Sequence, residues 1–264
     1  MRNLDAKRVL ITGGARGLGR ALATAFANAG ANVIISDLDA AAADVVAASL
    51  KRAASFRLDV TDPADVANVR ARILAAGPID VLVNNAGVVF GGPFTAVSAE
   101  RQQQTIAVNL NGVVGMTHAF LPDLLNRPEA HLINIASASA FIPLPNAAVY
   151  AATKWAVLGF TEALREELRL LGHRHIGVTA VCPSYVDTGL FAGARPPRFT
   201  RWLTAEEVAA ATVRAVQRRQ ELVLLPRRIR LLLGLGNLLP RPLRRRLISW
   251  TGVSTSMAAW RGRM

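Results

Sequence analysis

Tyr150 and Lys154 stand four residues apart in a segment whose pattern predicts a helix running to about residue 171. Positions i and i+4 share one face of a helix, so the phenol and the ammonium would project into the same space. A phenol has an ordinary pKa of about 10, and a neighbouring positive charge lowers that pKa because it favours the phenolate. The pair could therefore exchange a proton with a substrate near neutral pH, although the same spacing also occurs in helices that do no chemistry.

Two further polar groups follow short apolar runs. Ser137 comes just after residues 131–135, and Asn84-Asn85-Ala86-Gly87 follows residues 81–83. In an open parallel sheet, the carboxyl ends of the strands line the ligand crevice. The sequence therefore predicts that Ser137 lies near the Tyr–Lys pair, which favours a catalytic over a merely structural interpretation of that pair.

A glycine-rich turn lies near the N-terminus, between an apolar run at residues 9–11 and an Ala-rich helical segment. Its sequence is Thr12-Gly13-Gly14-Ala15-Arg16-Gly17-Leu18-Gly19. Glycines allow a tight turn and let the backbone approach a pyrophosphate, whose charge the N-terminus of the next helix favours. Because the pattern joins a strand to a helix in the first βαβ unit, it predicts a dinucleotide-binding turn rather than a structural one.

Asp37 ends the second apolar run, 18 residues after Gly19, where a carboxylate could accept hydrogen bonds from the adenosine ribose. It would also repel a 2′-phosphate, by about 4 kcal/mol for two unit charges about 4 Å apart at an effective dielectric of about 20. Arg16 is the opposing signal, because a basic side chain in the glycine turn could reach a 2′-phosphate. The sequence favours NAD as the cofactor and keeps NADP as the alternative.

Along the chain that carries these residues, short apolar runs alternate regularly with longer segments of helical period. The expected strands lie at residues 9–11, 33–35, 55–58, 81–83, 131–135 and 177–181. This rhythm predicts an α/β fold in which a single Rossmann-type domain contains a doubly wound parallel sheet of about seven strands, with helices on both faces. We assign residues 1–225 to this domain and residues 226–264 to a C-terminal extension.

Capping residues mark three helix starts. Asp62 precedes Pro63, Ser98 precedes a helical segment, and Thr204 and Glu207 form the pattern of a capping box. Residues 185–203 form a long irregular stretch. A loop of that length inside a compact domain usually acts as a functional lid.

The chain has 264 residues, of which 52% are hydrophobic and 19% charged, as expected of a globular protein with one large core. Its net charge of +13 suggests a polyanionic partner. Residues 226–264, however, hold nine arginines and no acidic residue, which leaves +4 on the first 225 residues. The charge therefore describes a basic tail on a mildly basic domain and argues against nucleic acid as the partner.

Cysteine and histidine usage narrows the chemistry further. The single cysteine, Cys182, cannot form an intrachain disulfide and is expected to be a small buried hydrophobe, which suits a cytoplasmic protein. The four histidines lack ligand spacing with Cys or carboxylates, so we expect no metal site. Pro226 and nearby arginines interrupt the apolar stretch at residues 222–239, so it does not resemble a membrane span of roughly 20 apolar residues.

Taken in order, the glycine turn, the Asn-Asn-Ala-Gly run, the serine and the Tyr-x-x-x-Lys pair resemble the short-chain dehydrogenase/reductase family over residues 7 to about 225. The resemblance implies hydride transfer between an alcohol carbon and C4 of nicotinamide, coupled to proton transfer through Tyr150. It places the catalytic tetrad on Asn109, Ser137, Tyr150 and Lys154.

The family's roles carry over to these positions by analogy. Tyr150 exchanges the proton, Ser137 hydrogen-bonds the substrate oxygen, and Lys154 binds the nicotinamide ribose. Asn109 holds a water that connects the lysine to solvent, although Asn111 is a second candidate in the same segment. The cofactor-binding positions, taken together, are Thr12, Gly13, Arg16, Gly17, Leu18, Gly19, Asp37, Leu38, Asp59, Val60, Asn85, Ala86, Gly87, Tyr150, Lys154, Pro183, Val186 and Thr188. Ser184 stands where the family usually has glycine, a departure that concerns the local loop geometry and not the chemistry.

The expected substrate pocket is apolar, which suits a bulky lipophilic alcohol or ketone such as a steroid or retinoid. Its expected lining consists of Phe90, Ser137, Phe141, Tyr150, Tyr185 and Phe191. Arg195, Arg198 and Arg201 in the loop could steer an anion. The segment from Ser184 to Phe191, followed by an Arg- and Leu-rich tail, is similar to the retinol and hydroxysteroid dehydrogenase branch.

Three functions remain open at this level: an NAD-dependent dehydrogenase of lipophilic alcohols, an NADPH-dependent carbonyl or ketoacyl-type reductase, and a catalytically retired dinucleotide-binding scaffold. The family resemblance implies a homodimer or homotetramer built on the helices near residues 105–121 and 150–171. Arginines beside Leu and Trp in residues 226–264 suit peripheral contact with an anionic membrane surface. The same segment could instead pack on its own domain or on a partner subunit.

Overall fold

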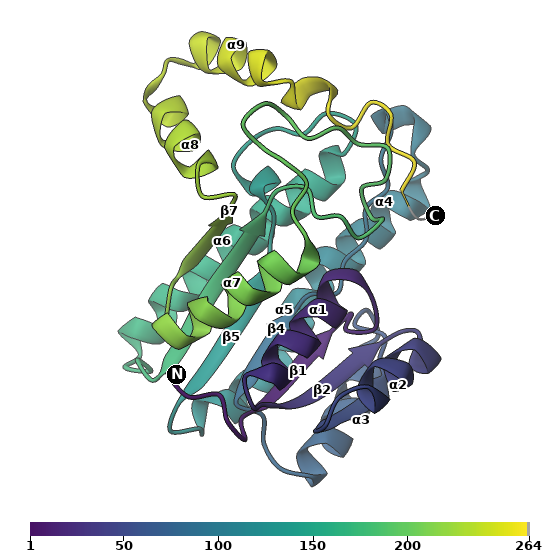
Figure 1. Ribbon diagram of the computed structural model, residues 1–264, viewed down its shortest axis with the longest axis vertical. Helices are drawn as coiled ribbons and strands as arrows, with labels where there is room; N and C mark the ends of the chain where they lie inside the picture. The colour runs from purple at the N-terminus through teal and green to yellow at the C-terminus, as the bar shows by residue number, and fades with distance from the viewer. Residues whose placement is uncertain (263–264) are drawn as a thin grey trace.

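The computed structural model describes residues 1–262, except the side chains of residues 232 and 235–237, and within them forms one sheet of seven parallel strands. The strand order is β3-β2-β1-β4-β5-β6-β7 (Figure 1). In chain order the strands are β1 (Arg8–Thr12), β2 (Asn32–Asp37), β3 (Ala53–Arg57), β4 (Val81–Asn84), β5 (Ala130–Ile135), β6 (Ile176–Pro183) and β7 (Leu222–Leu225). The predicted doubly wound parallel fold is confirmed, and all six strands placed by sequence are present.

The described helices alternate with these strands before the chain leaves the sheet. They are α1 (Gly17–Asn28), α2 (Ala40–Ala48), α3 (Pro63–Ala75), α4 (Ala99–Ile106), α5 (Gly112–Leu125), α6 (Ala148–Leu170), α7 (Ala205–Arg218), α8 (Ile229–Leu238) and α9 (Arg241–Thr251). The three predicted caps are confirmed: the side chains of Asp62, Ser98 and Thr204 accept bonds from the first-turn amides of α3, α4 and α7. Glu207 completes the capping box.

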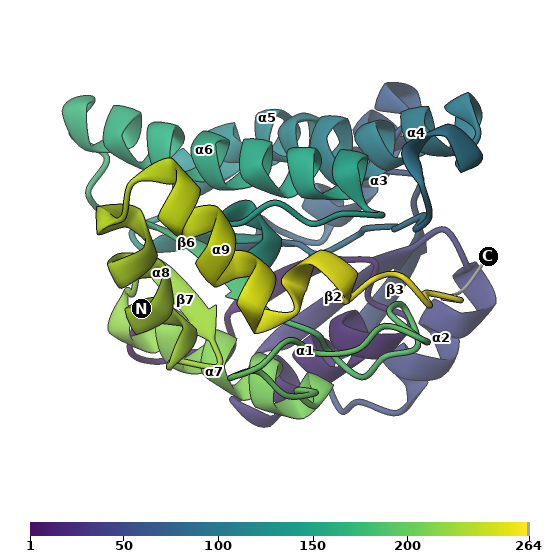
Figure 2. The same ribbon diagram turned by 90° about the horizontal axis from the view of Figure 1, so that it is seen from above.

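The core has two layers, one on each face of the sheet, because successive side chains of a strand point to opposite faces. In β1, Val9 and Ile11 pack with α1 and α7, whereas Leu10 packs with residues of α3 and α5. Figure 2 shows α1, α2 and α7 below the sheet and α3, α5 and α6 above it. The central strands β4, β5 and β6 are buried along their whole length, as expected of parallel strands covered on both sides.

The strand order reverses between β1 and β4, which are neighbours in the sheet but far apart in the chain. Ligands of open α/β sheets bind outside the carboxyl ends of the strands at such a point. The glycine turn follows β1 and the Asn-Asn-Ala-Gly run follows β4. The topology therefore brings together two segments that the sequence separates by about seventy residues.

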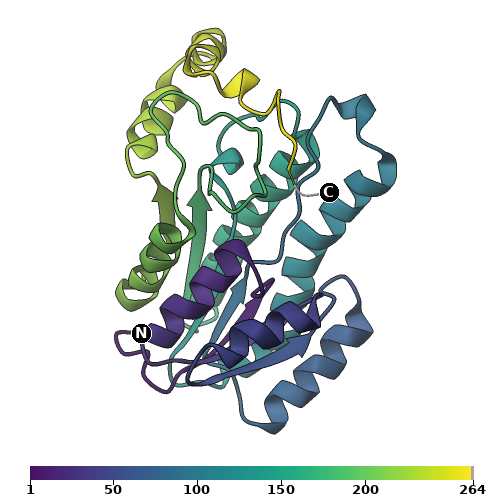
Figure 3. The same cartoon turned by 45° about the vertical axis from the view of Figure 1, so that its right-hand side comes forward.

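The C-terminal extension crosses above the carboxyl edge of the sheet (Figures 1 and 3). It consists of α8, α9 and a 3₁₀ turn, and its last two residues lie outside the described part of the chain. Its backbone bonds to the irregular stretch 185–203, where the amides of Arg195 and Arg198 donate to carbonyls of Ser256 and Thr251. Of the placements that the sequence left open, packing on its own domain is the one observed.

Candidate active site

A cleft at the carboxyl ends of β1 and β4 contains the glycine turn. Gly13 and Gly17 have φ angles of +63° and +49°, a backbone region that favours glycine. A Cβ atom at Gly19 would lie 1.9 Å from the carbonyl oxygen of Gly13, and one at Gly17 would lie 3.0 Å from Cβ of Thr188. The turn closes tightly against itself and against the loop after β6, so its backbone forms the floor of the cleft.

Asn85 and Thr12 connect the two halves of this cleft. The Asn85 side-chain amide donates to the carbonyl oxygens of Thr12 and Gly13, at 3.0 and 2.9 Å. The Thr12 hydroxyl accepts bonds from the backbone amides of Asn85 and Ala86. Thr12, predicted to bind cofactor, is buried and positions the glycine turn, because its hydroxyl is engaged by these amides.

Asp37 lies at the end of β2 and points its carboxylate toward the glycine turn. One carboxylate oxygen accepts from the Ala15 amide at 3.0 Å, and the other accepts from the Asp39 amide at 3.1 Å. Arg16, the residue that could favour a 2′-phosphate, forms an ion pair with Asp39. The negative charge of Asp37 therefore faces the cleft, whereas the positive charge of Arg16 is paired with Asp39.

The predicted cofactor residues other than Thr12 line this one cleft. The lining includes Gly13, Arg16, Gly17, Leu18, Gly19, Asp37, Leu38, Asp59, Val60, Asn85, Ala86, Gly87, Tyr150, Lys154, Pro183, Val186 and Thr188. The Asp59 carboxylate accepts two bonds from Thr61, which hold its pKa below the usual value. A Cβ atom at Gly13 or Gly19 would clash with neighbouring backbone, so only glycine fits at these positions and the backbone of the turn stays accessible. These residues therefore fit the pyrophosphate of a dinucleotide. Gln104 and Val108 also line the cleft and were missed by sequence reasoning.

Tyr150 lies in the first turn of α6 and is almost fully buried. Burial raises the pKa of its phenol, and a hydrogen bond with Ser137 offsets only part of that effect. The predicted lowering of this pKa is therefore wrong for the protein alone, because desolvation outweighs the attraction expected from Lys154. The phenol is consequently protonated at neutral pH.

Lys154 projects from the same face of α6 as Tyr150, with its Nζ atom 5.7 Å from the centroid of the Tyr150 ring. Its ammonium donates to the Ile135 carbonyl at 2.8 Å, at the end of β5. Burial lowers its pKa to about 8. The lysine is thus held at the junction of α6 and β5, within the dinucleotide cleft.

Asn109 is fully buried in a π-helical turn (Ala107–Asn111) between α4 and α5, whereas Asn111 is exposed. The Asn109 side chain bonds twice to Val88, accepting from its amide and donating to its carbonyl, both at 2.8 Å. A Cβ placed on Gly87 would lie within 4 Å of both Asn109 and Lys154. Of the two asparagines, Asn109 is the one that reaches the site.

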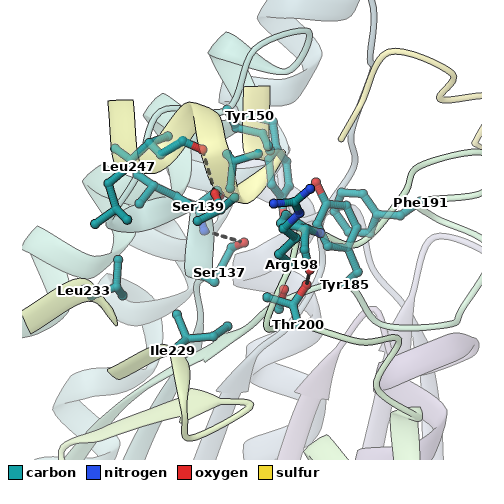
Figure 4. A pocket seen from close by; sticks show the side chains of 18 of the residues that line it. Ser137, Ser139, Tyr150, Tyr185, Phe191, Arg198, Thr200, Ile229, Leu233 and Leu247 are labelled. Carbon is teal, nitrogen blue, oxygen red and sulfur yellow. Dashed lines mark hydrogen bonds between the residues drawn. The ribbon is translucent and has the colours of Figure 1, made fainter. Parts of the chain in front are cut away.

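Ser137 follows β5 and presents its hydroxyl to a second, apolar cavity, where Ser139 lies beside it (Figure 4). The Ser137 oxygen accepts from the Ser139 amide at 3.1 Å. The Ser139 hydroxyl is buried and has no hydrogen-bond partner in the described part of the chain. Sequence reasoning missed Ser139, although its i+2 position after Ser137 places it in the same turn.

Tyr150, Ser184 and Phe191 line both the apolar cavity and the dinucleotide cleft. Ser137 lines the cavity, and Lys154 lines the cleft. Both tyrosines of the chain take part, since Tyr185 also lines the cavity and its ring packs edge-on against Phe191. The two spaces therefore meet at the Tyr150 phenol.

Of the six residues predicted to contact substrate, four line the apolar cavity and two are not part of its described lining. Ser137, Tyr150, Tyr185 and Phe191 line the cavity. Phe90 and Phe141 are not part of its described lining: Phe90 packs under the Arg101 guanidinium, and Phe141 packs with the cluster around Val157 and Leu158. Ile142 and Leu144 provide the apolar contacts expected of that region, because the loop after β5 turns Phe141 toward the core.

Much of the cavity wall comes from the C-terminal extension. Ile229 and Leu233 of α8 and a stripe on α9 line it, the latter consisting of Arg244, Leu247, Ile248 and Thr251. These α9 positions follow i, i+3, i+4, i+7 spacing, which marks one helix face. The spacing could have revealed that α9 has an inward face but not what that face covers.

In the described residues there is no cluster of three or more His, Cys, Asp or Glu side chains that could hold a metal ion. Cys182 is buried, as predicted, and burial raises the pKa of its thiol to about 12. Within the same described range, no helix is long and apolar enough to span a bilayer.

Comparison with known proteins places this geometry in a family. A family model described as short chain dehydrogenase matches residues 7–198. The chain is 39% identical over 204 residues to a 1-deoxy-11-beta-hydroxypentalenate dehydrogenase of Streptomyces exfoliatus, covering 74% of this chain and 73% of the relative. It is 28% identical over 244 residues to human estradiol 17-beta-dehydrogenase 11, covering 90% and 81%. A short chain dehydrogenase/reductase of Burkholderia phymatum, solved in complex with NAD, superimposes with a TM-score of 0.82 at 29% identity, covering 90% and 95%.

Proposed function

Because the chain belongs to the short-chain dehydrogenase family, we propose that it transfers hydride between NAD and a lipophilic alcohol or the corresponding carbonyl compound. It is an oxidoreductase of alcohol or carbonyl groups, with a nicotinamide cofactor. The finer proposal rests on one observation: the Tyr150 phenol lies where the dinucleotide cleft meets the apolar cavity. A proton donor at that junction can serve a substrate in the cavity.

The chain's own residues divide the proton chemistry among them. Tyr150, protonated at neutral pH, donates its proton to a carbonyl oxygen when a ketone is reduced. When an alcohol is oxidised, the phenolate form of Tyr150 accepts the hydroxyl proton. Ser137 hydrogen-bonds the same substrate oxygen and fixes its position. Lys154 holds positive charge beside the phenol and the ribose end of the cleft, and Asn109 orients the segment beside it. A nicotinamide bound in the cleft supplies or accepts the hydride.

Replacing Tyr150 by Phe tests this assignment. The variant should lose at least about 1,000-fold in kcat, since it lacks the proton donor, while NADH still binds with a Kd within about threefold of the original. Tyr185→Phe is the matched control, because the Tyr185 hydroxyl bonds to Ser256 and has no part in the proton transfer, so turnover should stay measurable at 340 nm even though the extension loosens. Undiminished turnover by Tyr150→Phe would refute the mechanism.

The preference for NAD is supported by Asp37, whose carboxylate faces the glycine turn and would repel a 2′-phosphate. It is supported again by the ion pair that occupies Arg16 with Asp39. These observations weigh against the NADPH-dependent carbonyl reductase that the sequence left open. Ser137, Tyr150 and Lys154 are all present and buried. This weighs against a catalytically retired dinucleotide-binding scaffold, because such a protein has no need of the three catalytic side chains.

The lipophilic character of the substrate is supported by the cavity, whose wall is largely apolar. Relatives named for a steroid and for hydroxypentalenate agree with that class. This proposal is tested by measuring kcat/KM with NAD for a panel of steroid, retinoid and small alcohols. Higher kcat/KM for small polar alcohols than for the bulky ones would reject it.

We further propose a cytoplasmic protein that contacts an anionic membrane surface through residues 226–264. Leu231, Leu238 and Trp250 are 74%, 82% and 54% exposed, and arginines flank them. Apolar side chains among cations suit the interface of an anionic bilayer. Co-sedimentation with phosphatidylserine-containing vesicles should fall for a Leu238→Ser/Trp250→Ser variant, and equal sedimentation of both proteins would dismiss the contact.

A homodimer or homotetramer built on α5 and α6 is the remaining proposal. Val114 on α5 and Trp155 on α6 are large apolar side chains that are 39% and 49% exposed, which suits a face covered by a second copy. Light scattering after size exclusion should give a multiple of 28.2 kDa, and Trp155→Glu should shift the mass to that of the monomer. A monomeric original chain would overturn this proposal.

A further inference from the structure

Two arginines from distant parts of the chain line the apolar cavity. Arg198 comes from the irregular stretch 185–203, and Arg244 comes from α9. Figure 4 shows Arg198 among the side chains around this cavity, together with Ser137, Tyr150 and Tyr185. The fold thus places two cationic groups in the space that receives the substrate.

Neither guanidinium forms an ion pair in the described part of the chain, and no Asp or Glu is part of the cavity's described lining. Arg198 stacks on Trp250, with its Cζ atom 5.3 Å from the ring centroid. Arg244 donates one bond, to the Phe141 carbonyl at 3.1 Å. A guanidinium has five N–H donors in a fixed fork, so most donors of this pair remain available to a bound molecule.

The neighbouring loop arginine behaves differently. Arg201 forms a bidentate ion pair with Glu207 and does not line the cavity. The two cavity arginines also lie outside the described lining of the dinucleotide cleft, so a cofactor phosphate does not account for them. Arg198 is exposed and Arg244 is half-buried, so water reaches both before a substrate binds. A substrate that fills the cavity displaces that water, and a desolvated cation is costly unless an opposite charge accompanies it. The missing charge is therefore expected on the substrate.

We propose that the substrate is a lipophilic alcohol or carbonyl compound that also carries a carboxylate, and that Arg198 and Arg244 bind this carboxylate. The inference rests on the proposed function, since it assigns the reacting group of the substrate to Tyr150 and Ser137. The planar fork of an arginine matches a carboxylate in two parallel hydrogen bonds. The two residues would thereby orient the apolar body of the substrate so that its alcohol reaches the phenol.

The test compares acids with their own methyl esters. Probes are steroid alcohols with a side-chain carboxylate and straight-chain ω-hydroxy acids, each paired with its ester, and binding is followed by tryptophan fluorescence with NADH present. The original protein should bind the preferred acid at least about 10-fold more tightly than its ester, as expected for charge-assisted hydrogen bonds. In an Arg198→Gln/Arg244→Gln variant, that ratio should fall to about one.

Arg245→Gln is the matched control, because Arg245 is the exposed neighbour of Arg244 on α9 and its loss changes the charge without changing the cavity lining. The control should keep the preference for the acid. Esters that bind as tightly as acids in the original protein, or a preference that survives the double substitution, would overturn the proposal. If acids bind preferentially through these arginines but no probe is turned over with NAD, the proposed function fails while the carboxylate site stands.

Discussion

The choice between NAD and NADP can be tested by a single change of charge at Asp37. Two unit charges about 4 Å apart at an effective dielectric of about 20 repel by about 4 kcal/mol. Asp37 is partly exposed, and solvent and salt should reduce this to about 1–2 kcal/mol, which corresponds to roughly 5- to 30-fold in affinity. We therefore expect NADH to bind more tightly than NADPH by about that factor, and Asp37→Asn to remove the difference.

The assay is the Kd of each cofactor, measured by the fluorescence of the reduced nicotinamide in the original protein and in the variant. The ratio of the two Kd values is the quantity to compare. The Asp37 carboxylate accepts backbone bonds from Ala15 and Asp39 through separate oxygens, so an amide there would weaken binding of both cofactors. Only the repulsion of the 2′-phosphate affects NADPH alone.

Asp39→Asn is the matched control, because it frees Arg16 from its ion pair and leaves Asp37 charged. This change should strengthen NADPH binding by up to about 10-fold and leave NADH within about twofold. The reasoning is refuted if the original protein binds NADPH as tightly as NADH, or if the Kd ratio is the same after Asp37→Asn.

Three further changes test other parts of the structure. Tyr185→Phe removes a buried 2.7 Å hydrogen bond to Ser256, so the packing of the extension on the domain should weaken by about 0.5–1.5 kcal/mol. A limiting amount of protease should then cut residues 226–264 more rapidly than in the original protein. Equal cleavage rates would show that this hydrogen bond does not hold the extension in place. His131 is fully buried and its pKa is lowered from 6.5 to about 3, so protonation favours the unfolded chain. Lowering the pH from about 7.5 to about 5 should reduce the unfolding free energy by about 2 kcal/mol through this residue. The unfolding free energy of His131→Phe, measured by urea denaturation at both pH values, should not show this decrease. Gly19→Ala should weaken NADH binding at least about 10-fold, whereas Gly115→Ala, with open space around its added methyl, should not change it.

Local rules account for the parts of the site that could be predicted. The i, i+4 spacing puts Tyr150 and Lys154 on one face of α6, and the end of β5 brings Ser137 beside them. The sequence predicts that Phe90 and Phe141 line the substrate pocket, because they stand in apolar loops near these elements, but the direction of a loop side chain depends on packing from elsewhere. The predicted pKa of Tyr150 was wrong for a similar reason, since the lysine is visible in the sequence while the burial of the phenol is not.

The parallel sheet, its caps, the glycine turn and the Ser137-Tyr150-Lys154 set could be predicted from the sequence, because they depend on periodicity and on spacing within single elements. Long-range packing, in contrast, folds α8 and α9 back over the carboxyl edge of the sheet, where they wall the cavity. It also brought Arg198 and Arg244 into one apolar space, although 46 positions separate them in the chain. The stripe on α9 marks a face to be buried, but the apolar surface that it meets is assembled from loops and helices distant in sequence, and no local pattern encodes that meeting.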